Sequence, residues 1–363
     1  MKRRQFLKVA GTGAAAGVIA SPAIAQATPE VRWRVTSSFP KSLDTIYGAS
    51  EVLAKAVSEA TDGKFQIQVF AAGEIVPGLQ AADAVTNGTV EMGHSGSYFY
   101  IGKDTAFAFG TVIPWGPNSR QMQAWLFHAG GLELLNEFYA KFNIYNLPAG
   151  NTGAQMGGWF RKEIKSLEDL KGLKMRIAGL GGQIMSKLGV VPQQIAGGDI
   201  YPALERGTLD AVEFSGPLDD EKLGFQKVAK YYYYPGFWEG NANVSFLVNL
   251  EKWNALPAAY KAIVEAACAE ANALCVAKYD HGNPDALMRL AGTGAELRPF
   301  PQEVMAAAFK EAFAMYADLA AKNAEFKTFY DSFLPYWKKE NLWFRVAELP
   351  FDAFNAQMSQ QMR

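Results

Sequence analysis

The sequence predicts an α/β protein with two similar lobes that face each other across a cleft. In the segment 167–216, a short apolar strand ends at Arg176, a helix follows, and a second strand ends at the carboxylate Glu213. A stretch similar to its GTLDAVEFSG occurs about 119 residues upstream, as GTVEMGHSG at 88–96. Repeated strand–helix units predict parallel sheets. Two such lobes suit a protein that captures a small anion in the cleft between them.

Length and composition agree with two lobes and exclude several functions. The chain has 363 residues, with 35 basic and 36 acidic side chains, so no basic stripe indicates a nucleic-acid partner. Cys268 and Cys275 lie seven residues apart. On a helix they would share a face but stand about 10 Å apart, too far for a disulfide. Three scattered histidines without an HExxH or CxxC pattern argue against a zinc site.

The N-terminus predicts export. Residues 2–8, KRRQFLK, are typical of a twin-arginine signal, and small and apolar residues follow at 11–20. Ala23 and Ala25 fit the small-residue pattern that signal peptidase requires. We therefore predict a signal peptide at 1–25 and a mature chain from Gln26; the alternative is an uncleaved anchor. No other apolar run reaches the roughly 18 residues of a membrane-spanning helix.

The first half of the chain alternates strands with helices. Alternating apolar and polar residues predict strands, and longer periodic stretches between them predict helices. The strands are expected at 31–36, 65–70 and 90–94, and the helices at 45–59, capped by Asp44, and at 78–87, closed by Gly88. The aromatic run Tyr98–Tyr100 follows the third strand, where open α/β sheets bind ligands. Hydrophobic packing beneath a loop is the other interpretation of these rings.

The second half predicts a return between lobes and a helical end. A helix is expected at 119–140, a short turn capped by Ser166, and strands at 144–147, 155–160, 174–177 and 246–249, some of which cross between the lobes. The domain prediction is therefore 26–150 mainly for lobe 1, 151–250 mainly for lobe 2 with crossover strands, and 251–363 for a helical region that braces the lobes and supplies a dimerisation tail. Residues 306–321 are apolar nearly all round. Such a helix either braces both lobes or packs on a partner chain.

Two motifs in the second lobe resemble a known family. The stretches DLKGLKMR at 169–176 and YPALERGTLDA at 201–211 are similar to signatures of the periplasmic solute receptors of tripartite ATP-independent periplasmic (TRAP) transporters. The resemblance covers essentially the whole mature chain. Longer stretches resemble the 2-oxo acid branch of these receptors: SSFPKSLDT at 37–45, GNTGAQMGGWFR at 150–161, VPQQIAGGDIYP at 191–202, GPLDDEKLGF at 216–225 and YYYYPG at 231–236.

This resemblance implies a fold, a location and partners. It implies a two-lobed periplasmic binding protein with a hinge, crossing strands and a long C-terminal helical tail, working in the periplasm. It also implies a small 2-oxo or 2-hydroxy monocarboxylate of the pyruvate, 2-oxobutyrate or lactate class, bound with a cation and delivered to TRAP membrane subunits. Similar receptors form homodimers by exchanging a C-terminal helix, and the alternative is a tail folded across its own lobes.

The resemblance also implies the site residues. Arg176 lies where the family's carboxylate-binding arginine lies, and guanidinium is a planar fork suited to a carboxylate, although a surface ion pair is the alternative. Gln155 matches a glutamine that meets both cation and ligand. Glu213 and the main-chain carbonyl of Phe214 match metal ligands, and Glu239 is assigned to the cation or to a ligand hydroxyl. Only oxygen atoms are offered, which suits Na⁺ or Ca²⁺ rather than Zn²⁺.

The predicted ligand-binding set is completed from both lobes, and it departs from the family at one position. The full set is Arg176, Gln155, Phe214, Glu239, Asn151 and Tyr98. The branch carries Trp where this chain has Phe214, which leaves main-chain coordination intact but alters the pocket. Glu239 could instead be a solvated loop acid. His94 is interpreted as a packed scaffold residue more readily than as a ligand contact.

A receptor is favoured over two other functions. A periplasmic enzyme acting on a 2-oxo acid is the alternative, but the chain has no GxSxG elbow, no dinucleotide fingerprint after a first strand and no Cys/His dyad. The glycine-rich stretch 179–182 lacks the spacing and the acidic partner of a dinucleotide site. A sensor domain would need an output module, and no segment of the sequence supplies one. We therefore predict a non-catalytic receptor.

Overall fold

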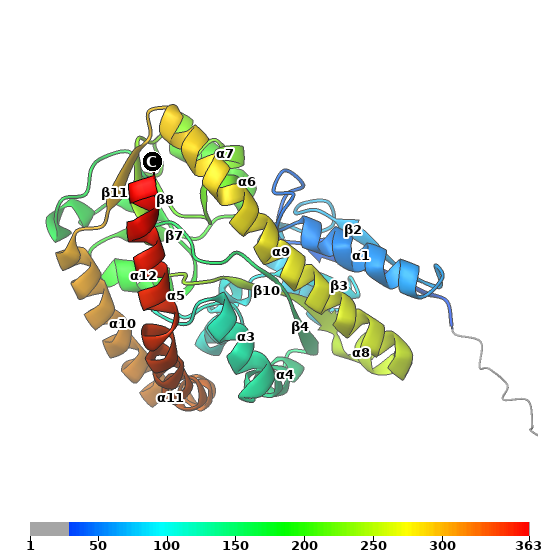
Figure 1. Ribbon diagram of the computed structural model, residues 1–363. Coiled ribbons are helices and arrows are strands. Elements are labelled where there is room, and N and C mark those ends of the chain that lie inside the picture. The colour runs from blue at the N-terminus through cyan, green and yellow to red at the C-terminus, as the bar shows by residue number, and fades with distance from the viewer. Residues whose placement is uncertain (1–28, 363) are drawn as a thin grey trace, which may run out of the picture.

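Two mixed β-sheets, one in each lobe, organise residues 29–362, which are the residues described by the computed structural model (Figure 1). The predicted signal peptide at 1–25 lies outside them. The first sheet has the order β2-β1-β3-β10-β4, with β1 Val31–Ser37, β2 Phe65–Phe70, β3 Met92–Ser95, β4 Ile144–Asn151 and β10 Asn243–Asn249. The second has the order β11-β9-β5-β8-β6-β7, with β5 Gly158–Phe160, β6 Lys174–Arg176, β7 Val191–Gln193, β8 Ala211–Val212, β9 Tyr231–Tyr234 and β11 Glu296–Pro299. The predicted two-lobed α/β architecture is confirmed.

Side-chain alternation explains the outer strands of the first sheet. In β2, Phe65 and Ile67 are buried while Gln66 and Gln68 are exposed, so the strand has one face on the core and one in water. β1 pairs in parallel with both β2 and β3, whereas β10 is antiparallel to β3 and β4. The chain enters the second lobe after β4 and returns through β10. Two connections therefore cross between the lobes side by side.

Helices cover both sheets, and one of them runs along both lobes. The helices are α1 Gly48–Ala60, α2 Ala81–Thr86, α3 Ser119–His128, α4 Gly131–Ala140, α5 Gly179–Lys187, α6 Gly197–Glu205, α7 Pro217–Leu223, α8 Leu250–Ala255, α9 Ala258–Gly292, α10 Gln302–Lys322, α11 Ala324–Val346 and α12 Glu348–Ser359. Short 3-10 helices are η2 Gly78–Gln80, η3 Ser97–Tyr100, η4 Thr105–Gly110, η5 Leu167–Leu170, η6 Phe225–Lys227 and η7 Gln360–Met362. The 35 residues of α9 pack on α1 and β4 at one end and on α7 at the other (Figure 1). No helix within residues 29–362 has the length and apolar character needed to cross a membrane.

The prediction that Asp44 caps a helix starting at residue 45 is wrong. The helix α1 begins at Gly48, and its N-cap, Tyr47, makes no side-chain capping bond. Asp44 instead forms ion pairs with Lys222 on α7 and with Lys278 on α9, the latter at 3.1 Å. Its carboxylate therefore links the segment after β1 to the second lobe, and a partner far away in sequence outweighs the local capping role.

The helix predicted over 119–140 is two helices. α3 ends at His128, and Gly130 then adopts a left-handed φ of 79° before α4 begins. At the next position, a Cβ on Gly131 would lie 2.6 Å from the Trp125 ring, so close packing at this turn requires glycine. Similarly, the helix predicted at 78–87 is η2 followed by α2, and the strand predicted at 155–160 begins only at Gly158. In all three, the apolar pattern continues through a turn.

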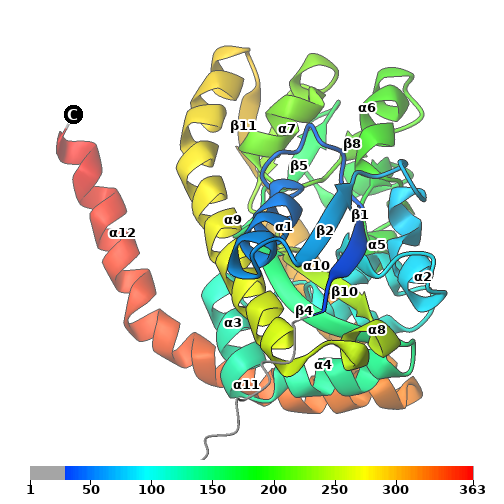
Figure 2. The ribbon, with the colours of Figure 1, turned by 90° about the vertical axis from the view of Figure 1, so that its right-hand side faces the viewer.

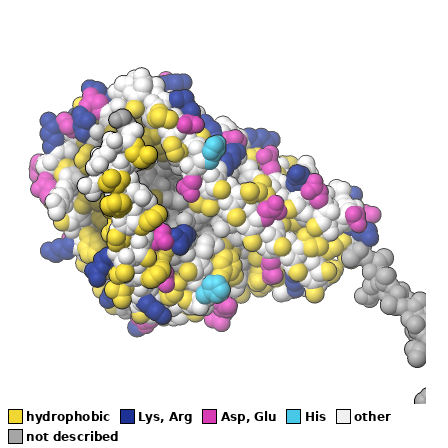
Figure 3. All heavy atoms as spheres, in the orientation of Figure 1, with side chains coloured by type: hydrophobic (Ala, Val, Ile, Leu, Met, Phe, Trp, Pro, Cys, Tyr) yellow, Lys and Arg dark blue, Asp and Glu magenta, His cyan; other side chains and the backbone are white. Residues whose placement is uncertain are grey.

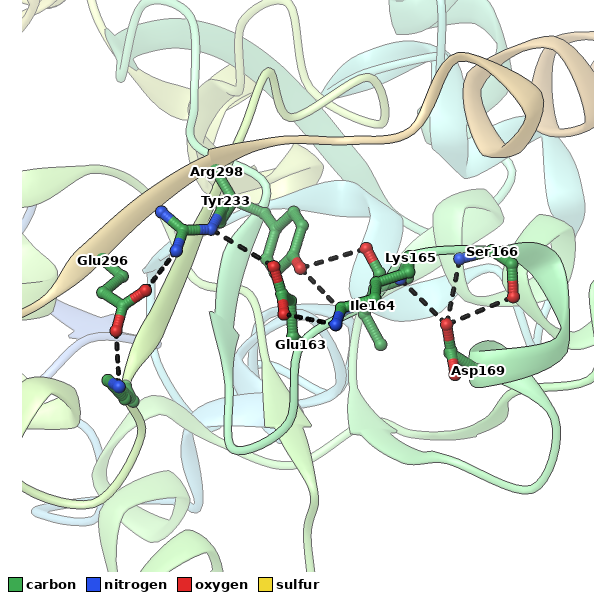
Figure 4. Close-up of polar contacts among 9 residues, drawn as sticks. Glu163, Ile164, Lys165, Ser166, Asp169, Tyr233, Glu296 and Arg298 are labelled. Carbon is green, nitrogen blue, oxygen red and sulfur yellow. Dashed lines mark hydrogen bonds and ion pairs between the residues drawn. The ribbon is translucent and has the colours of Figure 1, made fainter.

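The predicted Ser166 cap is confirmed within a polar network at the edge of the second sheet (Figure 4). The Ser166 amide donates to Asp169 Oδ2 at 2.9 Å, and this closes the turn that leads into β6. Nearby, the hydroxyl of Tyr233 accepts from the Ile164 amide at 2.6 Å and donates to the Ile164 carbonyl at 3.1 Å. Arg298 on β11 pairs with Glu163 at 3.4 Å. These contacts tie β9 and β11 to the segment that positions β6.

The C-terminal helices divide into a packed part and a projecting part. Phe326, Phe329 and Phe333 of α11 pack around Phe109 of η4 in the first lobe. α10 packs on α5 of the second lobe, so these two helices brace both lobes. α12 stands away from the body of the molecule, and none of its described residues is buried (Figure 2). The apolar 306–321 stretch is thus part of the brace. Cys268 and Cys275 on α9 are buried free thiols, as predicted.

Candidate functional site

Arg176 and Glu213 meet because their strands are neighbours. β6 and β8 are parallel, with Arg176 paired to Val212, so Arg176 at the end of β6 and Glu213 just after β8 lie at the same edge of the sheet. Nη1 of Arg176 donates to Glu213 Oε1 at 2.6 Å and to the Glu213 carbonyl at 2.7 Å. Both side chains are almost fully buried, at 1% and 2% exposure. The alternative interpretation of Arg176 as part of a surface ion pair is therefore ruled out.

Further contacts fix the plane of the Arg176 guanidinium. Its Nε donates to the Ile195 carbonyl at 3.3 Å, and the Phe214 ring centroid lies 5.4 Å from Cζ. Nη2 has no hydrogen-bond partner among residues 29–362. A guanidinium held on two sides, with one nitrogen still available, is preorganised to donate to an anion.

The connection that follows β4 and the one that precedes β10 meet at Gln155 and Glu239. The main-chain amide of Gln155 donates to the main-chain carbonyl of Glu239 at 3.1 Å. The main-chain amide of Gly236 donates to the main-chain carbonyl of Gln155 at 3.0 Å. Gln155 Nε2 donates to Thr152 Oγ1 at 3.0 Å, which turns its Oε1 elsewhere. Within the described part of the chain, Gln155 Oε1 and Glu239 Oε2 are buried oxygens without a hydrogen-bond partner. Buried acceptors of this kind are costly unless something binds them.

The charges of the site are unbalanced. Burial raises the pKa of Glu239 well above its ordinary value, the charge of Glu213 raises it further, and Arg176 opposes both. Burial also raises the pKa of Glu213, while Arg176 and the Ala178 amide, which donates at 3.2 Å, counteract part of that rise. Two buried carboxylates thus share a single guanidinium. This arrangement favours the binding of a cation or a proton at the two carboxylates. Because Glu239 is buried, the alternative interpretation of it as a solvated loop acid is wrong.

Tyr98 brings the first lobe to the site. It lies in η3, directly after β3, and is buried. Burial raises the pKa of Tyr98, and the charge of Glu239 raises it further, as does that of Glu213, while Arg176 lowers it. The ring lies against Gly179 of the second lobe, where an added Cβ would be 3.1 Å from Tyr98 Cδ2. This aromatic ring therefore covers the charged cluster from the opposite lobe.

Asn151 and His94 are engaged within the scaffold. Asn151 Nδ2 donates to Asn241 Oδ1 at 2.9 Å, and its Oδ1 accepts from the Gly153 amide at 2.8 Å. The predicted ligand contact of Asn151 thus stays a prediction. His94 packs on Phe246 and Phe39, and burial lowers its pKa to about 3, so the imidazole is neutral.

The residues present fit a cation with oxygen ligands. Among residues 29–362, no three His, Cys, Asp or Glu side chains cluster to hold a metal ion. A cation here would therefore depend on the two carboxylates together with Gln155 Oε1 and the Phe214 carbonyl. Such a mixed set of carboxylate, amide and main-chain oxygens suits Na⁺ or Ca²⁺.

A cavity of about 550 Å³ opens at the boundary between the lobes. Ser38 and Gly78 line it from the first lobe, and Gln194 and Ile195 line it from the second. Ile195 is the residue whose carbonyl binds Arg176, so the cavity lies beside the segment that holds the guanidinium. Its volume matches that of sites for small molecules.

Three residues around the site were missed from the sequence. Thr152 orients Gln155, Asn241 holds Asn151, and Gln194 bridges the lobes. Thr152 and Gln194 lie inside stretches with a family resemblance, but their roles depend on hydrogen bonds across loops. No periodic pattern could have singled them out.

Comparisons with known proteins identify the family of the chain. The model of the bacterial extracellular solute-binding protein family 7 matches residues 36–323. A Nostoc protein named monocarboxylate 2-oxoacid-binding periplasmic protein is 51% identical over 360 residues, or 98% of this chain and 99% of its own length.

Two solved structures are also similar. One is a TRAP transporter solute-binding protein from Bordetella bronchiseptica, a dimer with copurified calcium and picolinate in an active site. It is 52% identical with a TM-score of 0.91, and the match covers 93% of this chain and 100% of that one. The other is a TRAP periplasmic solute-binding protein from Pseudoalteromonas atlantica with bound sodium and pyruvate. It is 37% identical with a TM-score of 0.86, and the match covers 89% of this chain and 98% of that one. The chain therefore belongs to the bacterial extracellular solute-binding protein family 7.

Proposed function

We propose that this protein is a periplasmic receptor for a small 2-oxo or 2-hydroxy monocarboxylate, which it binds with Na⁺ or Ca²⁺ and delivers to TRAP transporter membrane subunits. The observation that carries the proposal is the buried cluster of Arg176, Glu213, Gln155 and Glu239 between the lobes. Because the chain belongs to a solute-binding family, it is a receptor rather than an enzyme acting on such acids.

Each residue of the cluster has a distinct task in this proposal. Nη2 of Arg176 donates to the ligand carboxylate, since Nη1 and Nε are already bonded to Glu213 and Ile195. Gln155 Oε1 and Glu239 Oε2 supply the acceptors that lack partners in the described part of the chain. A bound cation supplies the positive charge that lets two carboxylates and an anionic ligand share one buried site.

Tyr98 and Phe214 limit the size of the ligand. The ring of Phe214 covers one face of the guanidinium, and Tyr98 covers the cluster from the first lobe. The related proteins are named for 2-oxo acids, or hold pyruvate or picolinate, all of them small carboxylates. Closure of the lobes about their hinge then removes the bound acid from water.

Calorimetry tests this function with a panel of acids. Pyruvate, lactate, 2-oxobutyrate and longer 2-oxo acids are titrated into the mature protein while Na⁺ and Ca²⁺ are varied independently. We expect binding of at least one 2-oxo or 2-hydroxy acid that strengthens when cation is added. Binding only of sugars or amino acids would refute the ligand class, and affinity that is insensitive to exhaustive chelation in sodium-free buffer would refute the cation.

We further propose that the protein forms a homodimer through its C-terminal tail. Phe351 and Phe354 of α12 are 66% and 62% exposed, and Trp343 at the end of α11 is exposed as well. A groove of about 570 Å³ lies between α3, α9 and α11, and Figure 3 shows hydrophobic side chains gathered beside a hollow on this side. An apolar helix beside an open groove favours exchange of α12 between two copies. The Bordetella relative is itself described as a dimer.

A further inference from the structure

One side chain at the cavity mouth is bonded to the main chain of both lobes. Gln194 follows β7 in the second lobe, and its Nε2 donates to the carbonyl of Phe99 in the first lobe at 3.0 Å. Its Oε1 lies 3.5 Å from the Gly179 amide, which donates to it from the start of α5. The two ends of a single amide group therefore join η3 to α5.

The segment that carries Gln194 is also fixed to the ligand-binding arginine. Arg176 pairs with Gln193 across β6 and β7, and the Ile177 amide donates to the Gln193 carbonyl at 3.2 Å. On the other side of Gln194, the Ile195 carbonyl accepts from Arg176 Nε at 3.3 Å. The residues on both sides of Gln194 are thus in contact with Arg176 or with the residue that follows it.

On the first lobe, the acceptor of Gln194 is next to the ring that covers the site. Phe99 follows Tyr98, and their ring centroids are 4.5 Å apart. Tyr98 rests on Gly179, where a φ of 62° and the absence of a Cβ allow the close approach. In the structure, the bond from Gln194 to Phe99 therefore occurs together with the position of Tyr98 over the charged cluster.

From these contacts we propose that Gln194 is a closure latch, a positioning residue that holds Tyr98 of the first lobe over the Arg176 site of the second. This inference rests on the proposed receptor function. The bond lies at the exposed mouth of the cavity, so it contributes modestly and can break when the lobes separate. A latch of this strength slows release of a bound acid without preventing it.

The test compares three variants with the wild-type protein, using pyruvate with CaCl₂ as the probe. Gln194→Ala removes both bonds, and Gln194→Glu keeps the shape but replaces the donor to the Phe99 carbonyl with a repelling oxygen. Gln68→Ala is the control, because Gln68 is exposed on β2 and its side chain makes no hydrogen bond among residues 29–362. Stopped-flow measurement gives the association and dissociation rates separately.

We expect pyruvate to dissociate about three- to ten-fold faster from both Gln194 variants, with association and melting temperature unchanged. Gln68→Ala should match the wild type. Dissociation from both variants within two-fold of the wild-type rate would overturn the latch, as would equal acceleration in the control.

A second measurement separates the latch from the ligand assignment. Distances between spin labels on η3 and α6 are recorded without any acid for the wild type and Gln194→Glu, and we expect longer distances in the variant. If the wild type binds no 2-oxo acid but this shift is present, the proposed function fails and the latch holds. Identical distance distributions in the two ligand-free proteins would refute the latch.

Discussion

Tyr279 donates a 2.5 Å hydrogen bond to Asp219 and thereby joins α9 to α7 inside the second lobe. The next residue, Asp220, accepts from Tyr232 at 2.7 Å and from Trp159 at 3.1 Å. The second oxygen of each carboxyl is buried and has no hydrogen-bond partner within residues 29–362. Burial raises the pKa of Asp219 to about 6 and that of Asp220 to about 7.

These two carboxyls make stability depend on pH. Their folded-state pKa values exceed the ordinary value of 3.8. At pH values between the ordinary and the folded-state pKa, the folded protein therefore binds more protons than the unfolded chain. The stability that they contribute is complete below about pH 4 and is lost as the pH rises through 6 and 7. We expect Asp220→Asn to raise the free energy of unfolding at pH 8 by about 1–3 kcal/mol, because Asn keeps the acceptor without the charge.

Urea unfolding of Asp220→Asn at several pH values checks this expectation. The advantage of the variant should shrink towards pH 4, where the wild-type carboxyl is protonated in the folded state. Asp62→Asn, on an exposed turn, is the control and should leave the pH dependence unchanged. A variant that is less stable than the wild type at pH 8 would contradict the argument.

Replacing the guanidinium should remove ligand binding. Arg176→Met keeps much of the side-chain volume but leaves a buried ligand carboxylate without its charged donor, which costs roughly 2–5 kcal/mol. We expect the affinity for pyruvate to fall by about thirty-fold or more in calorimetry. Arg32→Met, on an exposed part of β1, is the control. Near-native affinity in Arg176→Met would remove this residue from the site.

Neutralising Glu239 should weaken the link between cation and ligand. Glu239→Gln removes one of the two buried negative charges while keeping an oxygen acceptor. We expect the enhancement of pyruvate affinity by Ca²⁺ to fall by about ten-fold, since less charge remains to be balanced. Calorimetry with and without Ca²⁺ measures this ratio, with Glu59→Gln on the exposed face of α1 as the control. An unchanged ratio would exclude Glu239 from the cation site.

Removing α12 should produce a monomer that still binds ligand. A chain ending at Ala347 keeps α10 and α11, whose aromatic side chains are packed against the rest of the molecule. We expect light scattering to give the mass of one chain for this truncation and of two chains for the intact mature protein. The double variant Phe351→Ser, Phe354→Ser should also shift the protein towards the monomer. A monomeric intact protein, or a dimeric truncation, would refute the exchange.

The sequence predicted strands better than helix ends. Phe65–Phe70 was placed with the bounds that the structure has, because a half-buried strand repeats every two residues. Asp44 was assigned to a local cap, whereas its partners, Lys222 and Lys278, are far away in sequence. Local pattern carries no information about such pairs, and it also cannot locate the turn at Gly130 within a continuous apolar stretch.

In the candidate site too, positions set by local strand patterns could be predicted from the sequence, whereas contacts between separate connections could not. Arg176 and Glu213 could be placed together because Arg176 ends one strand and Glu213 follows its parallel neighbour. Gln155 and Glu239 were assigned only by family resemblance, since they lie in separate connections that meet through main-chain bonds. The hydrogen bond from Arg176 Nη1 to Glu213 was not foreseen. Because of it, Nη2 alone, rather than both terminal nitrogens of the guanidinium, is available to the ligand.

The helix α9 acts as a lever between the two lobes. Its 35 residues extend for about 52 Å, and it packs on the first lobe near one end and on α7 near the other. A rotation of the second lobe by only about 10° around the end of α9 that packs on the first lobe would therefore displace its opposite end by about 9 Å. A membrane partner in contact with both ends of this rod would sense lobe closure as a change in spacing, without touching the bound acid.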